Sequence, residues 1–195
     1  MLHEPRLLAA NPWVARRPIT VAEYQRMGEV GISGERDRVE LIEGELVAMS
    51  PIGSYHTGTV NKLNHALVHA VGEHAIVAVQ NPVRLDDLSE PRPDFALLKP
   101  RADFHQGSPA RPADVLLLIE VADTSLKYDR SVKRALYAHH AIAELWIVDL
   151  TSGEVEVCRA PGTNGYAAVT RIGRDGAVEP ERLPGVRIQL ATLSR

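Results

Sequence analysis

The first third of the chain alternates polar and apolar residues in patterns that predict a short helix, a hairpin and a longer helix. Thr20 is followed three residues later by Glu23, which is the spacing of a capping box and predicts a helix that ends near Met27. Short apolar segments within residues 39–48, with acids between them, predict a β-hairpin. In residues 54–72 apolar side chains recur at steps of three and four, which is typical of an amphipathic helix packed on a sheet.

The middle of the chain contains three apolar runs that predict strands. They span residues 75–85, 94–100 and 114–122, and Pro- and Asp-rich loops separate them. The third run is apolar on both faces, which is typical of a strand covered on both sides. We therefore expect residues 114–122 at the centre of a sheet.

A further helix and three more strands are predicted after this central run. Asp129 is a suitable N-cap, and the helix that follows it would carry the apolar residues Val132, Ala135, Leu136 and Ala138. Residues 144–150 predict a buried strand. Residues 154–160 and 166–172 predict a β-meander that turns at residues 161–162.

The order of these elements predicts an α/β (α+β) fold with a central mixed β-sheet flanked by helices, an N-terminal hairpin and a C-terminal β-meander. Residues 1–18 are expected to form an N-terminal arm and residues 19–195 a single domain. A chain of 195 residues, of which 45% are hydrophobic, can bury one substantial core, so one domain is the expectation at this length.

Charge and cysteine content narrow the classes of partner. The net charge of −3 gives no overall attraction to nucleic acid, so a phosphate partner requires a local basic patch or a bound cation. Cys158 is the single cysteine, which excludes an intrachain disulfide and fits a reducing compartment. The N-terminal segment has charges where a signal peptide is apolar, and the longest apolar run is too short to span a bilayer. We expect a cytoplasmic protein without a membrane partner or an organic cofactor.

Two acids at the ends of predicted strands form the strongest chemical signal. Asp94 follows Pro93 at the start of one apolar run, and Glu120 lies near the end of another. Neighbouring strands are about 4.8 Å apart, so adjacent strands could direct both carboxylates into one cleft. Two carboxylates and the carbonyl oxygen of Val121 are hard donors of the kind that Mg²⁺ or Mn²⁺ prefers. A divalent cation held there could support phosphodiester cleavage.

Such a site also needs a positive charge, and the nearest lysines lie further along the chain than the strand itself. The position two residues after Glu120, on the same face of the strand, is Ala122. Lys127 and Lys133 are the nearest replacements. Lys133 lies on the predicted helix and shares a face with Tyr137 at i and i+4, whereas Lys127 lies in a predicted turn, where a charge is usually solvated. Lys133 is therefore favoured to orient or help deprotonate an attacking water and to offset phosphate charge.

Several other polar side chains have both a functional and an ordinary interpretation. His56, at the start of the long helix, could bind a phosphate or orient a carboxylate, or make an ordinary polar contact there. Tyr137 is either a packed aromatic or a second contact to substrate. His65 and His69 have i, i+4 spacing, but the absence of an HExxH signature or a cysteine partner makes a surface face the better explanation than zinc.

The hairpin contains three acids that alternate with apolar residues. Glu40, Glu43 and Glu45 alternate with Val39, Leu41, Leu46 and Ala48. An acid on the open face of a hairpin is usually only solvated. From the residues alone Glu40 is only slightly favoured, and Glu43 and Glu45 compete with it.

Several segments together carry a family resemblance. They are RVELIEGELVAMSP, SYHTGTV, PRPDFALL, LLLIEVADTSLKYDRSVKRALYAHHAIAELWIVDL and RLPGVRIQL. From about residue 20 to residue 193 the chain resembles the putative restriction endonuclease family, formerly a domain of unknown function, within the PD-(D/E)XK nuclease superfamily. Asp123-Thr124 stands where Ser-Pro is common in that family, and this difference removes no proposed ligand.

The resemblance implies a restriction-endonuclease-like sheet and a Mg²⁺-type site formed by Asp94 and Glu120. It also implies a lysine on the following helix, here Lys133, and an acid in the N-terminal hairpin, which we place at Glu40. The implied substrate is DNA, and the implied products carry 5′-phosphate and 3′-hydroxyl ends.

The first functional hypothesis is therefore a Mg²⁺- or Mn²⁺-dependent endonuclease acting on DNA, and two other hypotheses differ from it in chemistry. The residues assigned to catalysis are Asp94, Glu120, Lys133 and Glu40. Those assigned to substrate binding are His56 and Tyr137. Those assigned to the metal are Asp94, Glu120 and Val121. A homodimer is expected, because cutting both strands of a duplex often uses two sites. The alternative is a non-catalytic nucleic-acid-binding or assembly module with the nuclease fold. A third hypothesis is a hydrolase that uses the carboxylates on a non-nucleic substrate such as a glycoside.

Overall fold

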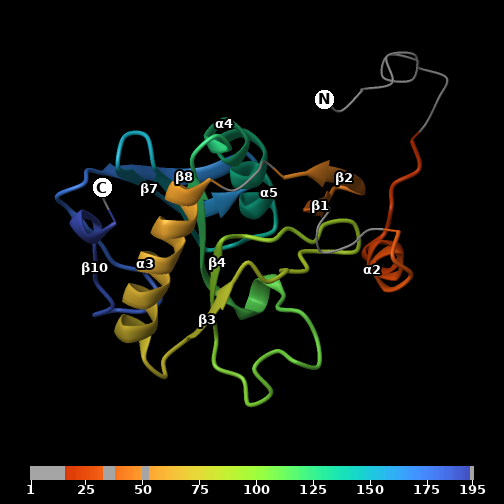
Figure 1. Ribbon diagram of the computed structural model, residues 1–195, viewed down its shortest axis with the longest axis horizontal. Coiled ribbons are helices and arrows are strands. Elements are labelled where there is room, and N and C mark those ends of the chain that lie inside the picture. Colours follow the sequence, from red (N-terminus) through yellow and green to blue (C-terminus); the bar gives the residue numbers. More distant parts are fainter. Residues whose placement is uncertain (1–15, 33–37, 50–52, 194–195) are drawn as a thin grey trace.

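A six-stranded mixed β-sheet forms the centre of the structure, a computed structural model that describes residues 16–32, 38–49 and 53–193 (Figure 1). The strand order is β3-β4-β5-β6-β7-β8. Strands β5 and β6 run parallel, and the other neighbouring strands run antiparallel. The strands are β3 (Ile76–Val79), β4 (Phe95–Leu98), β5 (Val115–Ala122), β6 (Glu144–Asp149), β7 (Glu154–Gly162) and β8 (Gly165–Ile172). The predicted mixed sheet is confirmed, with β5 as a fully buried inner strand.

Helices cover both faces of this sheet, as the burial of every residue along β5 requires. The long helix α3 (Ser54–Val71) packs on the face that carries Leu117, Ile119 and Val121. The opposite face carries Leu118 and Ala122 and packs against the helical segment of residues 126–139. Figure 1 shows α3 crossing the sheet on one side, with α4 and α5 at the edge near the hairpin. The predicted helix of residues 54–72 is thus confirmed.

The second helical segment differs from its prediction. It consists of α4 (Leu126–Tyr128), a π-helical turn (Asp129–Lys133) and α5 (Arg134–His139). Asp129 is therefore not an N-cap: the helix begins three residues earlier, and Asp129 lies buried inside it.

The predicted packing face of this helix was also partly wrong. Val132 and Ala135 are exposed, whereas Leu136 and Ala138 are buried as expected. The inward side carries two charged groups: Lys133 reaches carboxylates beneath the helix, and Asp129 accepts a hydrogen bond from Ser125, four residues earlier in the chain.

The N-terminal elements lie beside the sheet at one end of the molecule. Helix α2 (Val21–Glu29) begins at the predicted capping box: Glu23 N donates to Thr20 Oγ1 at 3.2 Å, and Thr20 N donates to Glu23 Oε2 at 2.9 Å. Strands β1 (Val39–Ile42) and β2 (Glu45–Ala48) form the predicted hairpin.

The packing predicted for the hairpin was wrong in part. Leu46 and Ala48 are exposed, and Glu40 is buried. The acid is tolerated inside because an ammonium and a backbone N–H reach its carboxylate.

The C-terminal part forms the predicted meander with a shifted turn. Pro161 pairs with Tyr166 and Gly162 with Gly165, so residues 163–164, rather than 161–162, make the turn. A small sheet follows, formed by β9 (Ala177–Val178) and β10 (Ile188–Gln189). Short 3₁₀ turns lie at Pro112–Asp114 and Leu190–Thr192.

Two sequence expectations concern the chain as a whole. None of the helices in the described ranges is long and apolar enough to cross a membrane. The division into an arm at residues 1–18 and a domain at residues 19–195 stays a prediction, and residues 1–15 of that arm lie outside the described ranges.

Candidate active site

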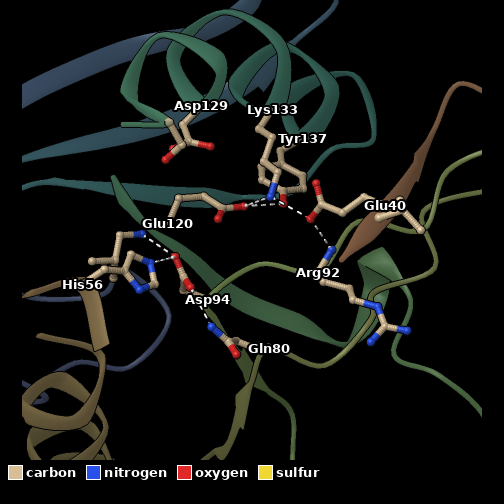
Figure 2. Close-up of polar contacts among 12 residues, drawn as sticks. Glu40, His56, Gln80, Arg92, Asp94, Glu120, Asp129, Lys133 and Tyr137 are labelled. Atoms are coloured by element: carbon tan, nitrogen blue, oxygen red, sulfur yellow. Dashed lines mark hydrogen bonds and ion pairs between the residues drawn. The ribbon is translucent and has the colours of Figure 1, made fainter. Parts of the chain in front are cut away.

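The pairing of β4 with β5 places the two predicted acids next to each other. Phe95 pairs with Ile119, so the next position along the antiparallel ladder brings Asp94 beside Glu120. Phe95 and Ile119 point into the core under α3. Because side chains alternate along a strand, Asp94 and Glu120 point to the opposite face, under the second helical segment (Figure 2).

Asp94 is held by contacts to both of its oxygens. Its Oδ2 accepts a hydrogen bond from Val121 N at 2.8 Å and lies 3.2 Å from His56 Nε2, and its Oδ1 accepts from Gln80 Nε2 at 3.2 Å. Burial raises the pKa of this carboxyl, but His56, Val121 and Gln80 together outweigh burial and lower it. The hydrogen bond to Asp94 raises the pKa of His56 against the opposing effect of burial. The pair therefore favours an ionised carboxylate beside a protonated imidazole.

Glu120 is buried and is bonded through one oxygen. Its Oε1 accepts from Tyr137 OH at 2.6 Å and from Lys133 Nζ at 3.1 Å. Burial raises the pKa of Glu120 to about 8, Lys133 opposes this, and nearby carboxylates such as Asp129 and Asp94 add to it. In Figure 2 the second carboxylate oxygen is turned away from Lys133, to the side on which Asp94 lies.

Lys133 joins the helix, the central strand and the hairpin. Its Nζ lies 2.9 Å from Glu40 Oε1, and the same oxygen accepts from the backbone N of Arg92 at 2.8 Å. Burial alone lowers the pKa of Lys133, but the Glu120 and Glu40 carboxylates outweigh it and raise this pKa. Lys133 thus stays an ammonium. This pairing also separates Glu40 from the other two hairpin acids, Glu43 and Glu45, which are exposed.

Asp129 is a fourth acid at the site, and sequence reasoning assigned it only a capping role. Its Oδ2 accepts from Ser125 Oγ at 2.7 Å, and burial raises its pKa. With Asp94, Glu120 and Lys133 it lines a cavity of about 270 Å³. The i, i+4, i+8 spacing of Asp129, Lys133 and Tyr137 is the signal that could have placed it on the same helix face.

Carboxylates at this cavity outnumber the cations bonded to them. Glu40, Glu120 and Asp129 are between 1% and 4% exposed, and the Asp94 side chain is 13% exposed. Lys133 and a protonated His56 are the cations bonded to this group, and Arg38 and Arg92 also line the cavity. Buried charge without a counter-charge is costly, and burial accordingly raises the pKa of Glu120 and of Asp129. A bound cation would favour the ionised form of these carboxylates and take the place of a proton.

The donor set fits a cation that keeps part of its water shell. Asp94 and Glu120 offer carboxylate oxygens and Val121 a carbonyl oxygen, and Mg²⁺ commonly uses one or two carboxylates together with water and substrate phosphate. Within the described ranges, no three Asp, Glu, His or Cys side chains are clustered as a ready-made metal cage.

The remaining sequence candidates lie apart from this group or act as scaffold. Lys127 is exposed. His65 and His69 make an edge-to-face ring contact, with centroids 4.5 Å apart. Gln80 and Arg92, which contact Asp94 and Glu40, had no signal in the sequence beyond their polarity. The seven residues assigned from the sequence lie together, linked by hydrogen bonds around the carboxylates of Asp94 and Glu120. They are Asp94, Glu120, Val121, Lys133, Glu40, His56 and Tyr137.

Comparison with known proteins gives a family and a fold. The family model described as Uma2, putative restriction endonuclease, matches residues 21–191. The crystal structure of a putative nuclease belonging to DUF820 from Anabaena variabilis ATCC 29413 is similar, with a TM-score of 0.69 and 16% sequence identity; the match covers 90% of this chain and 97% of that chain. At this identity the likeness shows the fold. No curated protein matches the chain. Because the family model spans most of its length, the chain belongs to the Uma2 family of putative restriction endonucleases.

Proposed function

We propose that the protein is a Mg²⁺- or Mn²⁺-dependent endonuclease that hydrolyses phosphodiester bonds in DNA, with a site of the PD-(D/E)XK type. The observation that carries this proposal is the surplus of buried carboxylates around one cavity, which a divalent cation would neutralise. Membership of the Uma2 family supports a nuclease-like function.

Asp94, Glu120 and the Val121 carbonyl would hold the cation. Bound Mg²⁺ or Mn²⁺ supplies Lewis acidity and counter-charge for the phosphate. In the reaction, water adds to phosphorus and gives up a proton to solvent, the bond from phosphorus to the 3′ oxygen breaks, and that oxygen takes a proton from solvent. The ends produced are a 5′-phosphate and a 3′-hydroxyl.

The other side chains have roles that follow from their contacts. Lys133 is an ammonium, so it would orient the water and stabilise phosphate charge instead of accepting a proton. Glu40 and Tyr137 position Lys133 and Glu120 through hydrogen bonds. His56, hydrogen-bonded to Asp94, would face the substrate phosphate from the start of α3.

The test is cleavage of duplex and single-stranded DNA in Mg²⁺ or Mn²⁺. Asp94→Asn, Glu120→Gln and Lys133→Met should each lose activity. Lys99→Gln is the matched control, because Lys99 is exposed and lies beyond the opposite end of β4 from Asp94. Equal cleavage by all five proteins would refute the assignment.

Calorimetry with Mn²⁺ separates this proposal from a non-catalytic module with the same fold. A nuclease requires Mn²⁺ binding that depends on Asp94 and Glu120, and a module predicts none. We also propose that the enzyme acts as a homodimer in the cytoplasm. The homodimer follows from the chemistry of cutting two strands. The cytoplasmic location fits the free, buried Cys158.

A further inference from the structure

A second, larger hollow adjoins the candidate active site. It has a volume of about 620 Å³, within the range of about 300–1,000 Å³ that is usual for ligand sites, and lies between α2 and the start of the hairpin. It shares Arg38, Met49 and Arg92 with the smaller cavity that contains the carboxylates. Gln80 also lines it and donates to Asp94 Oδ1. The two hollows are therefore neighbours with common walls, and the larger one is here called the flanking groove.

Two arginines at this junction have no carboxylate partner among the described residues, unlike several other arginines of the chain. Arg84 and Arg159, for example, form ion pairs at 2.7 Å and 2.8 Å. Within the described ranges neither Arg38 nor Arg92 has an ion pair with a carboxylate, and Arg92 Nε is buried without a hydrogen-bond partner. An unsatisfied buried donor costs about 1–3 kcal/mol. These guanidinium groups are therefore suited to an anionic ligand.

The backbone and the side chain of Arg92 face different parts of the site. Its backbone N–H donates to Glu40 inside the site, while Figure 2 shows its guanidinium directed away from Glu40 and from the carboxylate pair. Arg38 has φ of 42°, a conformation that is costly for a residue with a Cβ and that is often found at functional sites. An anion bound by this pair would lie beside the reacting phosphate.

The acids of the flanking groove are already neutralised in part. Glu29 is paired with Arg26 at 2.7 Å. Glu90 accepts a hydrogen bond from Gln25 Nε2 at 2.9 Å, and burial raises its pKa. Arg92 opposes this rise in the pKa of Glu90 and so shares part of its charge with that acid, but within the described ranges neither Arg92 nor Arg38 forms an ion pair with a carboxylate.

We propose that the flanking groove binds the DNA strand next to the scissile bond, and that Arg38 and Arg92 contact its phosphate groups. The inference rests on the proposed nuclease function and names the part of the protein that holds the substrate outside the reacting centre. Phosphate contacts of this kind position the strand without reading its bases.

The test measures the salt dependence of DNA binding by fluorescence anisotropy. Labelled duplex and single-stranded DNA are titrated with the full chain in Ca²⁺, and gel analysis confirms that the DNA stays intact. The slope of log Kobs against log[KCl] is negative, and its magnitude should fall by about 0.9 on duplex, or about 0.7 on a single strand, for each phosphate contact removed. Arg38→Gln and Arg92→Gln should each show this fall, and the double variant about twice as much.

Arg187→Gln is the matched control, because Arg187 is exposed and precedes β10, at the opposite end of the molecule from α2 in Figure 1. Its slope should equal that of the wild type. Mn²⁺ affinity and the circular dichroism spectrum should be unchanged in all variants. Wild-type binding with unaltered slopes in both arginine variants would overturn the flanking groove alone. Loss of Mn²⁺ affinity in these variants would also overturn it, by assigning the arginines to the metal site. Absence of DNA binding by the wild type would overturn both this inference and the proposed substrate.

Discussion

Replacing Glu120 with glutamine should stabilise the metal-free protein at neutral and alkaline pH while removing its metal binding. The amide keeps an oxygen that can accept hydrogen bonds from Tyr137 OH and Lys133 Nζ. It removes one of the negative charges that crowd the cavity with Asp94 and Asp129. Stability and function are therefore expected to change in opposite directions at this position.

The magnitude follows from the pKa of Glu120. Burial raises this pKa from 4.5 to about 8, so the folded state holds the proton more tightly than the unfolded chain does. The free energy of unfolding consequently falls as pH rises above 4.5 and stops falling above about pH 8. Each pH unit in this window is worth about 1.4 kcal/mol, because the unfolded chain releases a proton that the folded protein keeps, so the wild type loses about 3 kcal/mol of stability between about pH 5.5 and pH 8. The glutamine variant lacks this loss.

The assay is urea unfolding in EDTA, followed by tryptophan fluorescence, at about pH 5.5, 7 and 8.5. The difference between wild type and Glu120→Gln isolates this carboxyl, because other titrating groups are common to both proteins. Excess Mn²⁺ should then stabilise the wild type, by about 2.7 kcal/mol at a hundredfold excess over Kd, and leave the variant unchanged. Glu43→Gln, at an exposed acid in the hairpin turn, serves as control. A stability difference that stays constant with pH, or equal stabilisation of both proteins by Mn²⁺, would refute the reasoning.

Three further predictions concern single side chains. Lys133→Met leaves two buried carboxylates without their ammonium and should lower the free energy of unfolding by about 3–5 kcal/mol in urea denaturation. Tyr137→Phe removes the hydroxyl that donates to Glu120 and should cost about 1–2 kcal/mol by the same assay, with weaker Mn²⁺ binding by calorimetry. Thr20→Ala breaks the capping box of α2 and should cost about 1 kcal/mol without changing Mn²⁺ affinity. Unchanged stability of Lys133→Met, or weaker Mn²⁺ binding by Thr20→Ala, would contradict these expectations.

The adjacency of Asp94 and Glu120 could be predicted because it depends on local patterns. Each acid borders an apolar run, and two such runs separated by a loop pair readily as neighbouring strands. The same argument explains why the amphipathic helix and the capping box were located closely. Lys133 and Tyr137 could be selected because helical spacing puts them on one face.

The burial of Glu40 and Asp129 could not be predicted, because it depends on partners that are distant in the chain or on an irregular helix. Glu40 is buried by Lys133, 93 residues away. Asp129 lies in a π-helical turn, a feature that propensities do not reveal and that is often found at functional sites. Local rules place an acid in solvent or at a helix end, and both rules fail where tertiary contacts supply counter-charge.

The position of Ala122 explains why the lysine of this site lies on a helix. Ala122 is fully buried on the same face of β5 as Glu120, in the core cluster that contains Leu136 and Tyr137. A long charged side chain at 122 would have to displace the helix that covers this face. The helix supplies the ammonium from above, and Lys133 Nζ reaches Glu120 without leaving the packed interface. The Glu120 carboxylate needs an ammonium nearby in space. A lysine on the helix can supply it as well as a lysine on the strand, so the position of the lysine in the sequence can differ.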